Sequence, residues 1–552
     1  MKRISIVLLG SAVFAHAEVT PGEFLVSEMN CVACHEPTDA VKARLASRPA
    51  PLLGPDGVKA TPQWLREFLA DPQKAKPGTL MPDMMQSLPA DQKAEALEGL
   101  THFLASIQGA PARAAANASE TRITEGKALY HSIGCVQCHA PFTAPDGEEE
   151  EMTKLAASSV PLAGPGIAKK YTVGELAAFL ANPLKSRAGG RMPSLNLKKD
   201  EAESIAIYLL REQFPAAGRS NSGAQMLPLG DTAFVVDPAK AAIGAQYFVM
   251  LQCGNCHAGT PNPYTVSNIA PVARKFGELR PRQPSGCLAT APKAGTPKFD
   301  LTDRQKTVII AALKSQEILE LPLTGEQHIR RTMTVLNCFA CHARDRRGGI
   351  NGLHREYLAT IGDADMGDER KVPPHLNGVG AKLRPEWLSD VLLKGEKVRP
   401  YMALRMPVFG KDNVAHLPEL FEKADVPADA HAAPVGVVGK AETDAKWGRK
   451  LAGTTGLSCV ACHNFAGRKS PGVQGLDLAQ TGERLRFDWF RRYLLDPQSF
   501  RAGTRMPPFW PAGVAVNKDV LNGDAEAQIR ALWLYLSQAD FTLLPDGLVQ
   551  EK

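Results

Sequence analysis

The sequence predicts an all-α fold, a tandem array of five small, loop-rich domains, and three observations point to it. A motif of two cysteines and one histidine recurs five times along 552 residues. Segments with apolar residues at helical spacing precede the motif, and a second such segment, ending in Met-Pro, follows four of the five copies. Self-similarity of this kind indicates an array of repeated units.

The composition is that of an ordinary globular protein. Hydrophobic residues make up 44% of the chain and charged residues 22%, and the length allows several domains with buried cores. The 47 glycines and 42 prolines favour loop-rich domains over long bundles. Basic residues form no dense tract, which argues against nucleic acid as a partner.

The first 17 residues, MKRISIVLLGSAVFAHA, have the pattern of a secretory signal peptide. A basic start, an apolar run and Ala15-His16-Ala17 predict cleavage after Ala17. The alternative is an uncleaved anchor, but the apolar run is shorter than the roughly 20 residues that span a bilayer. We therefore expect a periplasmic or otherwise exported protein without a transmembrane segment.

The cysteine motifs define the expected domains. They read CVACH, CVQCH, CGNCH, CFACH and CVACH, begin at residues 31, 135, 253, 338 and 459, and use ten of the eleven cysteines. Small and polar runs at 109–121, 215–225 and 426–440 are expected to be linkers. The expected domains are 18–113, 114–225, 226–320, 321–435 and 436–552.

Four domains share a second element after the motif, at 61–82, 172–193, 384–407 and 486–507. Each has helical spacing of apolar residues, as in Trp64, Leu65, Phe68 and Leu69, and then a break and a Met-Pro loop. A closing helix follows, most clearly at 201–213 and 525–538. Each domain is therefore expected to be a small set of helices around its motif.

The motif C-x-x-C-H is the pattern of covalent haem attachment. Residues three apart on a helical turn share a face, so both thiols can add to the haem vinyl groups while the adjacent histidine reaches the iron. A zinc site would need two such pairs around one metal, and a redox disulfide an α/β surround. Five haems c are expected. The attaching residues are Cys31, Cys34, Cys135, Cys138, Cys253, Cys256, Cys338, Cys341, Cys459 and Cys462, and the iron-ligating histidines are His35, His139, His257, His342 and His463.

The Met-Pro loops supply candidates for the opposite axial position. A thioether is a weak, soft donor, and His/Met ligation raises the haem potential. The predicted ligands are Met81, Met192, Met406 and Met506. The alternative for any one of them is a role as core filler. Met402 competes with Met406, but the other loops align on the Met-Pro pair, which favours Met406.

With these features the sequence resembles the class I cytochrome c family over nearly the whole mature chain, in five copies. The resemblance rests on C-x-x-C-H, the helix before it, the Met-Pro loop and a closing helix with an aromatic residue (Phe103, Tyr208 or Trp533). It implies small all-α domains, each around one haem, that exchange single electrons.

The third domain departs from this pattern. Aligning GTPKF (295–299) with RMPVF (405–409) puts Thr296 at the methionine position. Pro281 and Pro284 should also interrupt the helix before that loop. The sixth ligand of the third haem is then either absent, water, or an unusual side chain. The candidates are Cys287, Lys293 and Lys298, or His328, His354 and His375 from neighbouring domains. Cys287 can equally be a small buried residue.

Three functions fit these patterns. The first is an extracytoplasmic electron carrier between redox partner proteins of unknown identity. The second is a haem enzyme, a peroxidase or small-oxide reductase, with the third haem as its open site. The third is a redox or gas sensor, although no segment resembles a signalling output. Enzymatic activity is left undecided, with no catalytic residue assigned.

Overall fold

The computed structural model describes residues 19–57, 59–108, 119–139, 162, 165–211, 234–258, 273–293, 296–350, 352–360, 371–396, 399, 401–434, 440–538, 541 and 543–548. The expected signal peptide, residues 1–17, lies outside these ranges. So do most of the expected linkers at 109–121 and 215–225.

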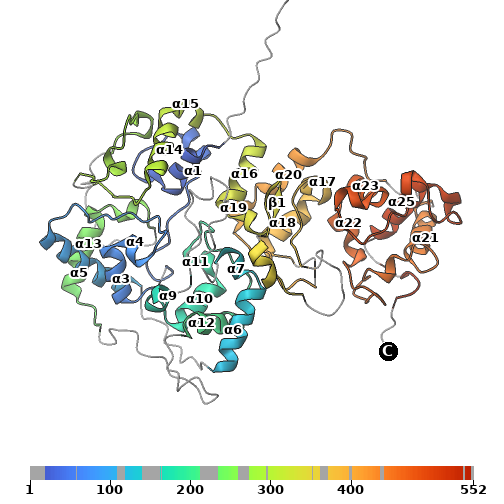
Figure 1. Cartoon of the computed structure of the whole chain (residues 1–552), viewed down its shortest axis with the longest axis horizontal. Helices are drawn as coiled ribbons and strands as arrows, with labels where there is room; N and C mark the ends of the chain where they lie inside the picture. The colour runs from blue at the N-terminus through green and yellow to red at the C-terminus, as the bar shows by residue number, and fades with distance from the viewer. Residues whose placement is uncertain are drawn as a thin grey trace, which may run out of the picture.

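The expected all-α class is confirmed, because the described residues are mostly helical (Figure 1). Their one sheet is a two-stranded antiparallel hairpin, β1 (Ala343–Arg344) and β2 (Arg347–Gly348), in which Ala343 pairs with Gly348. Short 3₁₀ turns complete the regular structure. The described α-helices are α1 (Pro21–Glu28), α2 (Asp39–Leu45), α3 (Pro62–Ala70), α4 (Pro72–Ala75), α5 (Ala90–Ile107), α6 (Glu120–Ser132), α7 (Cys135–Cys138), α9 (Pro165–Lys170), α10 (Val173–Ala181), α11 (Pro183–Ser186), α12 (Lys199–Leu209), α13 (Pro238–Met250), α14 (Asp303–Lys314), α15 (Gln316–Leu319), α16 (Gly325–Val335), α17 (Val379–Lys382), α18 (Pro385–Lys394), α19 (Lys411–Val414), α20 (Leu417–Asp425), α21 (Lys440–Ala452), α22 (Thr481–Arg484), α23 (Phe487–Leu495), α24 (Pro497–Phe500) and α25 (Ala525–Leu536).

Local sequence accounts for where these helices begin. The hydroxyl of Thr61 accepts from the backbone N–H of Trp64 at the start of α3, and Pro62 occupies the first helical turn. Thr172 and Glu175 form a reciprocal capping box on α10. The helices predicted after the motifs are confirmed as α3, α10, α18 and α23. The interruption predicted from Pro281 and Pro284 is confirmed too, since 276–288 contains only two 3₁₀ turns.

In all but the fourth motif, the helix that enters the motif crosses a closing helix at close range. In the second domain α6 packs on α12, and a Cβ added to Gly126 would overlap the backbone carbonyl of Ser204. In the fifth domain α21 packs on α25 in the same way. A glycine at the crossing is therefore what lets the two backbones approach.

The first and third domains do not close on themselves. Helix α1 packs on α14, and α13 packs on α5, so each entering helix crosses the closing helix of the other domain (Figure 1). A Cβ on Gly244 of α13 would overlap the carbonyl of Gly99 on α5. The two segments 18–113 and 226–320 thus exchange halves.

Two hydrophobic cores result from this exchange. The first-motif core combines residues 25–45, from the chain around Cys31, with residues 276–319. The third-motif core combines residues 64–104 with residues 245–251, which lead into Cys253. The expected boundaries at 113/114 and 225/226 therefore do not separate two independent cores. Full burial of Phe276 in the first-motif core contributes about 1.5–3 kcal/mol to holding the later segment on the earlier one.

The other three domains have cores built from one continuous stretch each. These cores draw on residues 130–210 for the second domain, 329–421 for the fourth and 445–536 for the fifth. Leu383 contacts the cores of both the fourth and the fifth domain.

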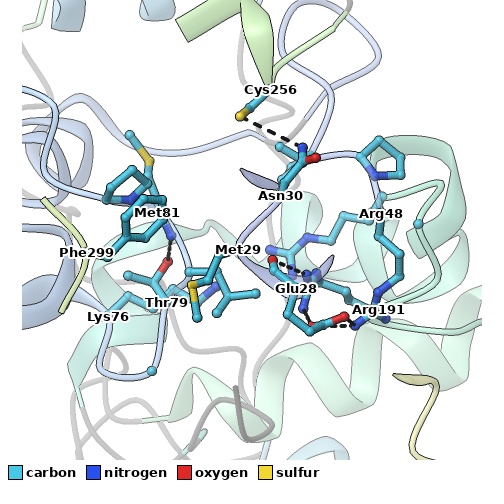
Figure 2. A pocket seen from close by; sticks show the side chains of 18 of the residues that line it. Glu28, Met29, Asn30, Arg48, Lys76, Thr79, Met81, Arg191, Cys256 and Phe299 are labelled. Atoms are coloured by element: carbon cyan, nitrogen blue, oxygen red, sulfur yellow. Dashed lines mark hydrogen bonds and ion pairs between the residues drawn. The ribbon is translucent and has the colours of Figure 1, made fainter. Parts of the chain in front are cut away.

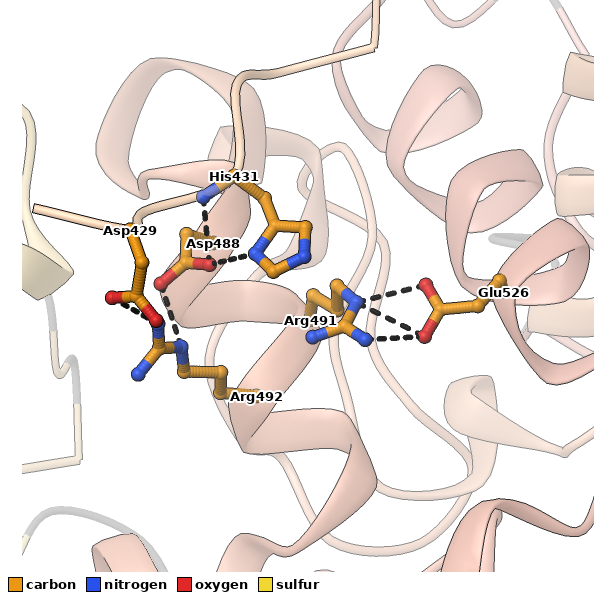
Figure 3. Close-up of polar contacts among 6 residues, drawn as sticks. All are labelled: Asp429, His431, Asp488, Arg491, Arg492 and Glu526. Carbon is orange, nitrogen blue, oxygen red and sulfur yellow. Dashed lines mark hydrogen bonds and ion pairs between the residues drawn. The ribbon is translucent and has the colours of Figure 1, made fainter. Parts of the chain in front are cut away.

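Neighbouring domains meet through two kinds of backbone contact. Ser194 and Val408 each lie two residues after the methionine of their Met-Pro loop. They form an antiparallel bridge that joins the second and fourth domains. At the other kind of junction, Leu383 bridges Leu485 between the fourth and fifth domains. Figure 3 shows part of this second junction, where Asp488 on α23 accepts from the backbone N–H of His431 at 3.0 Å.

Candidate functional site

The five cysteine motifs share one backbone geometry. Each begins directly after a residue in the left-handed region, and the chain then makes a single helical turn over the first three or four motif residues. This turn places the two cysteines on one side, as the spacing predicts. The left-handed residues are Asn30 (φ 52°), Gly134 (φ 120°), Gln252 (φ 57°), Asn337 (φ 55°) and Ser458 (φ 57°).

The motif histidines are held by backbone carbonyls. In four motifs the ring Nδ1 lies within hydrogen-bond distance of a carbonyl oxygen. Since a carbonyl can only accept, Nδ1 carries the proton and Nε2 keeps its lone pair. Burial also lowers the pKa of His257 and of His342, which favours this neutral form. The pairs are His35 with Arg274 (2.8 Å), His257 with Pro51 (2.9 Å), His342 with Pro374 (2.8 Å) and His463 with Leu476 (3.0 Å).

A ring held through Nδ1, with Nε2 left to coordinate, is the arrangement of a histidine that ligates a metal. The carbonyl partners also follow the exchange of halves. His35 of the first motif bonds Arg274 of the third segment, and His257 bonds Pro51 of the first segment.

Burial disfavours the thiolate form of the first cysteine in every motif. All eleven cysteines have free thiols in the structure. Burial raises the pKa of Cys31, the first cysteine of its motif, to about 12, and it has the same effect on Cys459. Catalytic and redox cysteines have lowered pKa values instead.

Motifs lie against one another in pairs. Asn30, just before the first motif, points its amide toward the Cys256 thiol at 4.0 Å (Figure 2). In return, Asn255 within the third motif points toward Cys34 at 3.8 Å. Asn337 makes the corresponding approach to Cys138 at 3.8 Å, so the second and fourth motifs are also neighbours.

Each Met-Pro loop brings its methionine to a core that contains one motif. Met192 packs on the core that includes Cys135, and Met506 on the one that includes Cys459. Met406 packs with Cys338 in the fourth domain. Met402 is buried but lies outside that core, with the Arg399 side chain near its sulfur.

Met81 is the exception to sequence order. It packs on the third-motif core together with Cys253, not on the first-motif core that contains Cys31. The expectation that Met81 faces the first motif therefore fails, because the α5–α13 crossing brings the first segment's loop to the third motif.

The odd loop around Thr296 faces the first motif instead. Cys287, a candidate ligand for the third motif, packs on the same core as Cys31, and it contributes to raising the pKa of the Cys31 thiol. Lys298 pairs with Asp83 in an antiparallel bridge. This matches the Ser194–Val408 bridge position for position, so Thr296 occupies the place of a methionine, as the alignment predicts.

The histidine candidates from neighbouring domains lie elsewhere. His328 stacks on His416 with ring centroids 4.3 Å apart, and His375 lies 3.2 Å from the Phe500 carbonyl in the fifth domain. His354 lines the cavity described next, on the side of the second motif, where its carbonyl accepts from Gln137.

A cavity of about 2390 Å³ connects the first three motifs and reaches the fourth. Its walls include the first-motif and third-motif thiols, Met81, Met192 and the Cys287 segment, and they are mostly apolar. Figure 2 shows Met81, Asn30 and Cys256 on these walls. Such a space suits a large, flat and mostly apolar group.

The cavity walls also hold cations that lack carboxylate partners. Lys170 is buried, and its ammonium lies 4.6 Å from the Trp64 ring centroid and 4.7 Å from that of Tyr171. Burial and the nearby Arg187 lower the pKa of Lys170 well below its ordinary value, and burial does the same to Lys76. Among the described residues, no carboxylate forms an ion pair with either lysine.

One carboxylate, Glu28, does lie among these cations. It pairs with Arg48 at 2.9 Å and with Arg191 at 2.7 Å (Figure 2). Burial by itself would raise the pKa of Glu28, but the two arginines outweigh burial and lower it. Glu28 is thus neutralised by its own partners and forms no ion pair with Lys76 or Lys170. The sequence gives no signal for this cluster, since lysines in KAKPG and AKKYT look like surface residues.

Among the described residues, no three His, Cys, Asp or Glu side chains gather as they do around a protein-bound metal ion. Among these residues too, none of the helices combines the length and apolar character that crossing a bilayer requires. The chain matches no family model, no curated protein and no solved structure.

Proposed function

We propose that the chain is an exported multihaem cytochrome c that transfers single electrons between redox partner proteins. Its five units would be cytochrome c-like domains, two of them formed by exchanged halves. The observation that carries the proposal is the histidine geometry. In four motifs the ring next to the second cysteine is held by a carbonyl through Nδ1, with Nε2 left to coordinate.

The described residues fit haem in three further respects. The two thiols of each motif lie on one turn, as covalent attachment to two vinyl groups needs. The cavity walls are mostly apolar and large enough for several such groups. Lys76 and Lys170 line this cavity, and the negative charge of a haem propionate beside either amino group would favour its protonated form.

The residues that would hold the five haems are the ten motif cysteines and His35, His139, His257, His342 and His463. Met81, Met192, Met406 and Met506 are proposed as distal ligands, with Met81 serving the third motif. When bound, haem supplies one-electron exchange between Fe(III) and Fe(II). A methionine thioether is a weak donor that favours the ferrous state, so these four residues would raise the potentials of their sites.

The remaining residues exclude water and fix the ligands. Apolar side chains such as Phe103 and Phe248, whose ring centroids are 5.5 Å apart, close the third-motif core. Backbone carbonyls keep four of the five histidine rings in one orientation, so little rearrangement accompanies a change of charge. Rigid, dry surroundings of this kind suit electron transfer.

A reductive titration of the purified exported protein tests this function. We expect stepwise, reversible uptake of five electrons per chain, one for each motif, and no turnover of hydrogen peroxide or small oxides. Steady peroxide consumption by the reduced protein would instead support a haem enzyme. That alternative draws on the one loop where Thr296 replaces methionine.

A further inference from the structure

The loop that lacks methionine faces the first motif, and this changes which site is predicted to be open. Cys31 and Cys287 belong to the first-motif core, whereas Met81 and Cys253 belong to the third-motif core. The bridge between Asp83 and Lys298 fixes the register of the two loops against each other. Four motifs therefore have the methionine of a Met-Pro loop on their core. The first has Thr296 at that loop position, and the methionine on its core is Met29, two residues before Cys31.

We propose that the first motif holds a haem with an open coordination position, and that this position binds a small anion. This inference rests on the proposed function, because it needs haem at the first motif.

Thr296 itself does not replace the methionine as a ligand. The Thr296 hydroxyl donates to the carbonyl of Lys293 at 2.5 Å and is thereby turned to its own loop. Lys298 is exposed and does not line the cavity, whereas Thr296 and Pro297 do. The described residues of this loop that line the cavity thus include no methionine or histidine.

The charge of the wall defines the ligand class. Arg274, Arg280, Arg282 and Lys293 are exposed residues that line the cavity beside the first motif. The lining near them has one buried carboxylate, Glu28, which Arg48 and Arg191 already neutralise. Positive side chains that line a cavity attract small anions and raise their local concentration near the site.

Azide and carbon monoxide are suitable probes, since the first is a small anion for ferric iron and the second a neutral ligand for ferrous iron. We expect one azide bound per chain in the ferric protein. Thr296→Met should abolish binding, and Met81→Ala should add a second azide.

Arg280→Gln with Arg282→Gln should weaken azide binding about three- to tenfold, because two nearby charges are lost, and leave carbon monoxide binding unchanged. Equal effects on both ligands would overturn the anion assignment.

A single-thioether variant identifies the haem that binds. Cys31→Ala leaves one vinyl group unsaturated at the first motif while Cys34 and His35 still hold the haem, which shifts that haem's absorption to longer wavelength. Cys253→Ala marks the third motif in the same way. The azide difference spectrum should move in Cys31→Ala and stay in place in Cys253→Ala. The opposite result would return the open site to the third motif and overturn the proposal.

Two further outcomes separate the possible failures. A chain without covalent haem, by intact mass, would contradict the proposed function itself. A chain with five haems that binds neither probe until Cys287→Ala is introduced would show that Cys287 fills the position, and the open-site proposal would be wrong.

Discussion

The first and third domains form a pair, and so do the second and fourth, but the two pairs are connected differently. In both pairs the loops bridge two residues past the methionine position, and in both an asparagine amide approaches a cysteine of the partner motif. Yet α6 crosses α12 of its own domain, whereas α13 crosses α5 of another. The same contact between domains accompanies closed domains in one pair and exchanged halves in the other.

This difference shows that the crossing itself does not specify connectivity. Gly126 on α6 and Gly244 on α13 both allow a closing helix to approach to backbone contact. The glycine-containing face of an entering helix can pack on either closing helix, because this packing requires only a small residue at the crossing and an apolar face. The partner is selected by the rest of the core, which in the exchanged pair includes residues nearly 300 positions apart.

The largest effect is expected from loss of the third attachment site. In Cys253→Ala with Cys256→Ala, the third-motif core should unfold, since the proposed haem would form part of that core. Hydrogen exchange should then speed up in α3 and α5, which belong to the first segment. If α3 and α5 stay protected, the halves are not exchanged. The matched variant, Cys459→Ala with Cys462→Ala, should affect only residues 440–548.

A buried ion pair gives the next largest effect. Glu23 on α1 pairs with Arg44 at 2.8 Å, and both side chains are 2% exposed. Glu23→Ala leaves a buried arginine unpaired and should cost about 3–5 kcal/mol in unfolding free energy of the first-motif core. Glu201→Ala removes a partly exposed pair with Arg405 between the second and fourth domains, and should cost less than about 1 kcal/mol. Denaturant unfolding that ranks the two variants the other way would contradict this account of the core.

The α5–α13 crossing can be strained directly. Gly244→Ala places a methyl group against the Gly99 carbonyl and should destabilise the third-motif core by about 1–3 kcal/mol. Hydrogen exchange should rise in α5 and α13 together. Gly325→Ala is the control, because its added Cβ meets Leu420 at an ordinary 3.7 Å. A rise confined to α13 would mean that α5 is not its partner.

The smallest effect concerns the cations that line the cavity. If a haem propionate holds Lys170 protonated, Lys170→Met removes a positive charge near the third-motif core and should lower one reduction potential by roughly tens of millivolts, as a charge at an effective dielectric of about 20 does. Lys382→Met is the matched variant, since Lys382 lies 4.5 Å from the Trp489 ring across the fourth–fifth junction. Redox titration of both variants compares how the reduction potentials respond near the third motif and at the fourth–fifth junction. Unchanged potentials in Lys170→Met would show that this lysine faces no redox group.

The helices and motif turns could be predicted from the sequence because their signals are local. Apolar spacing gave α3 and α23, and Pro281 with Pro284 gave the interrupted segment. The place of Thr296 was also predictable, because the Met-Pro loops align. The exchange of halves between the first and third domains could not be predicted. Helices α1 and α13 present similar small and apolar faces, and neither sequence specifies which closing helix it packs on. The same limit hid Lys170, whose burial depends on Trp64 from a distant segment.

The central claim, that each of the five motifs carries a covalently attached haem, is tested most directly by the intact mass of exported protein. The account predicts the mass of the chain processed after Ala17 plus five haems, with one haem on each C-x-x-C-H peptide after proteolysis. A chain with four or fewer haems, or with metal released by a chelator instead, would contradict it.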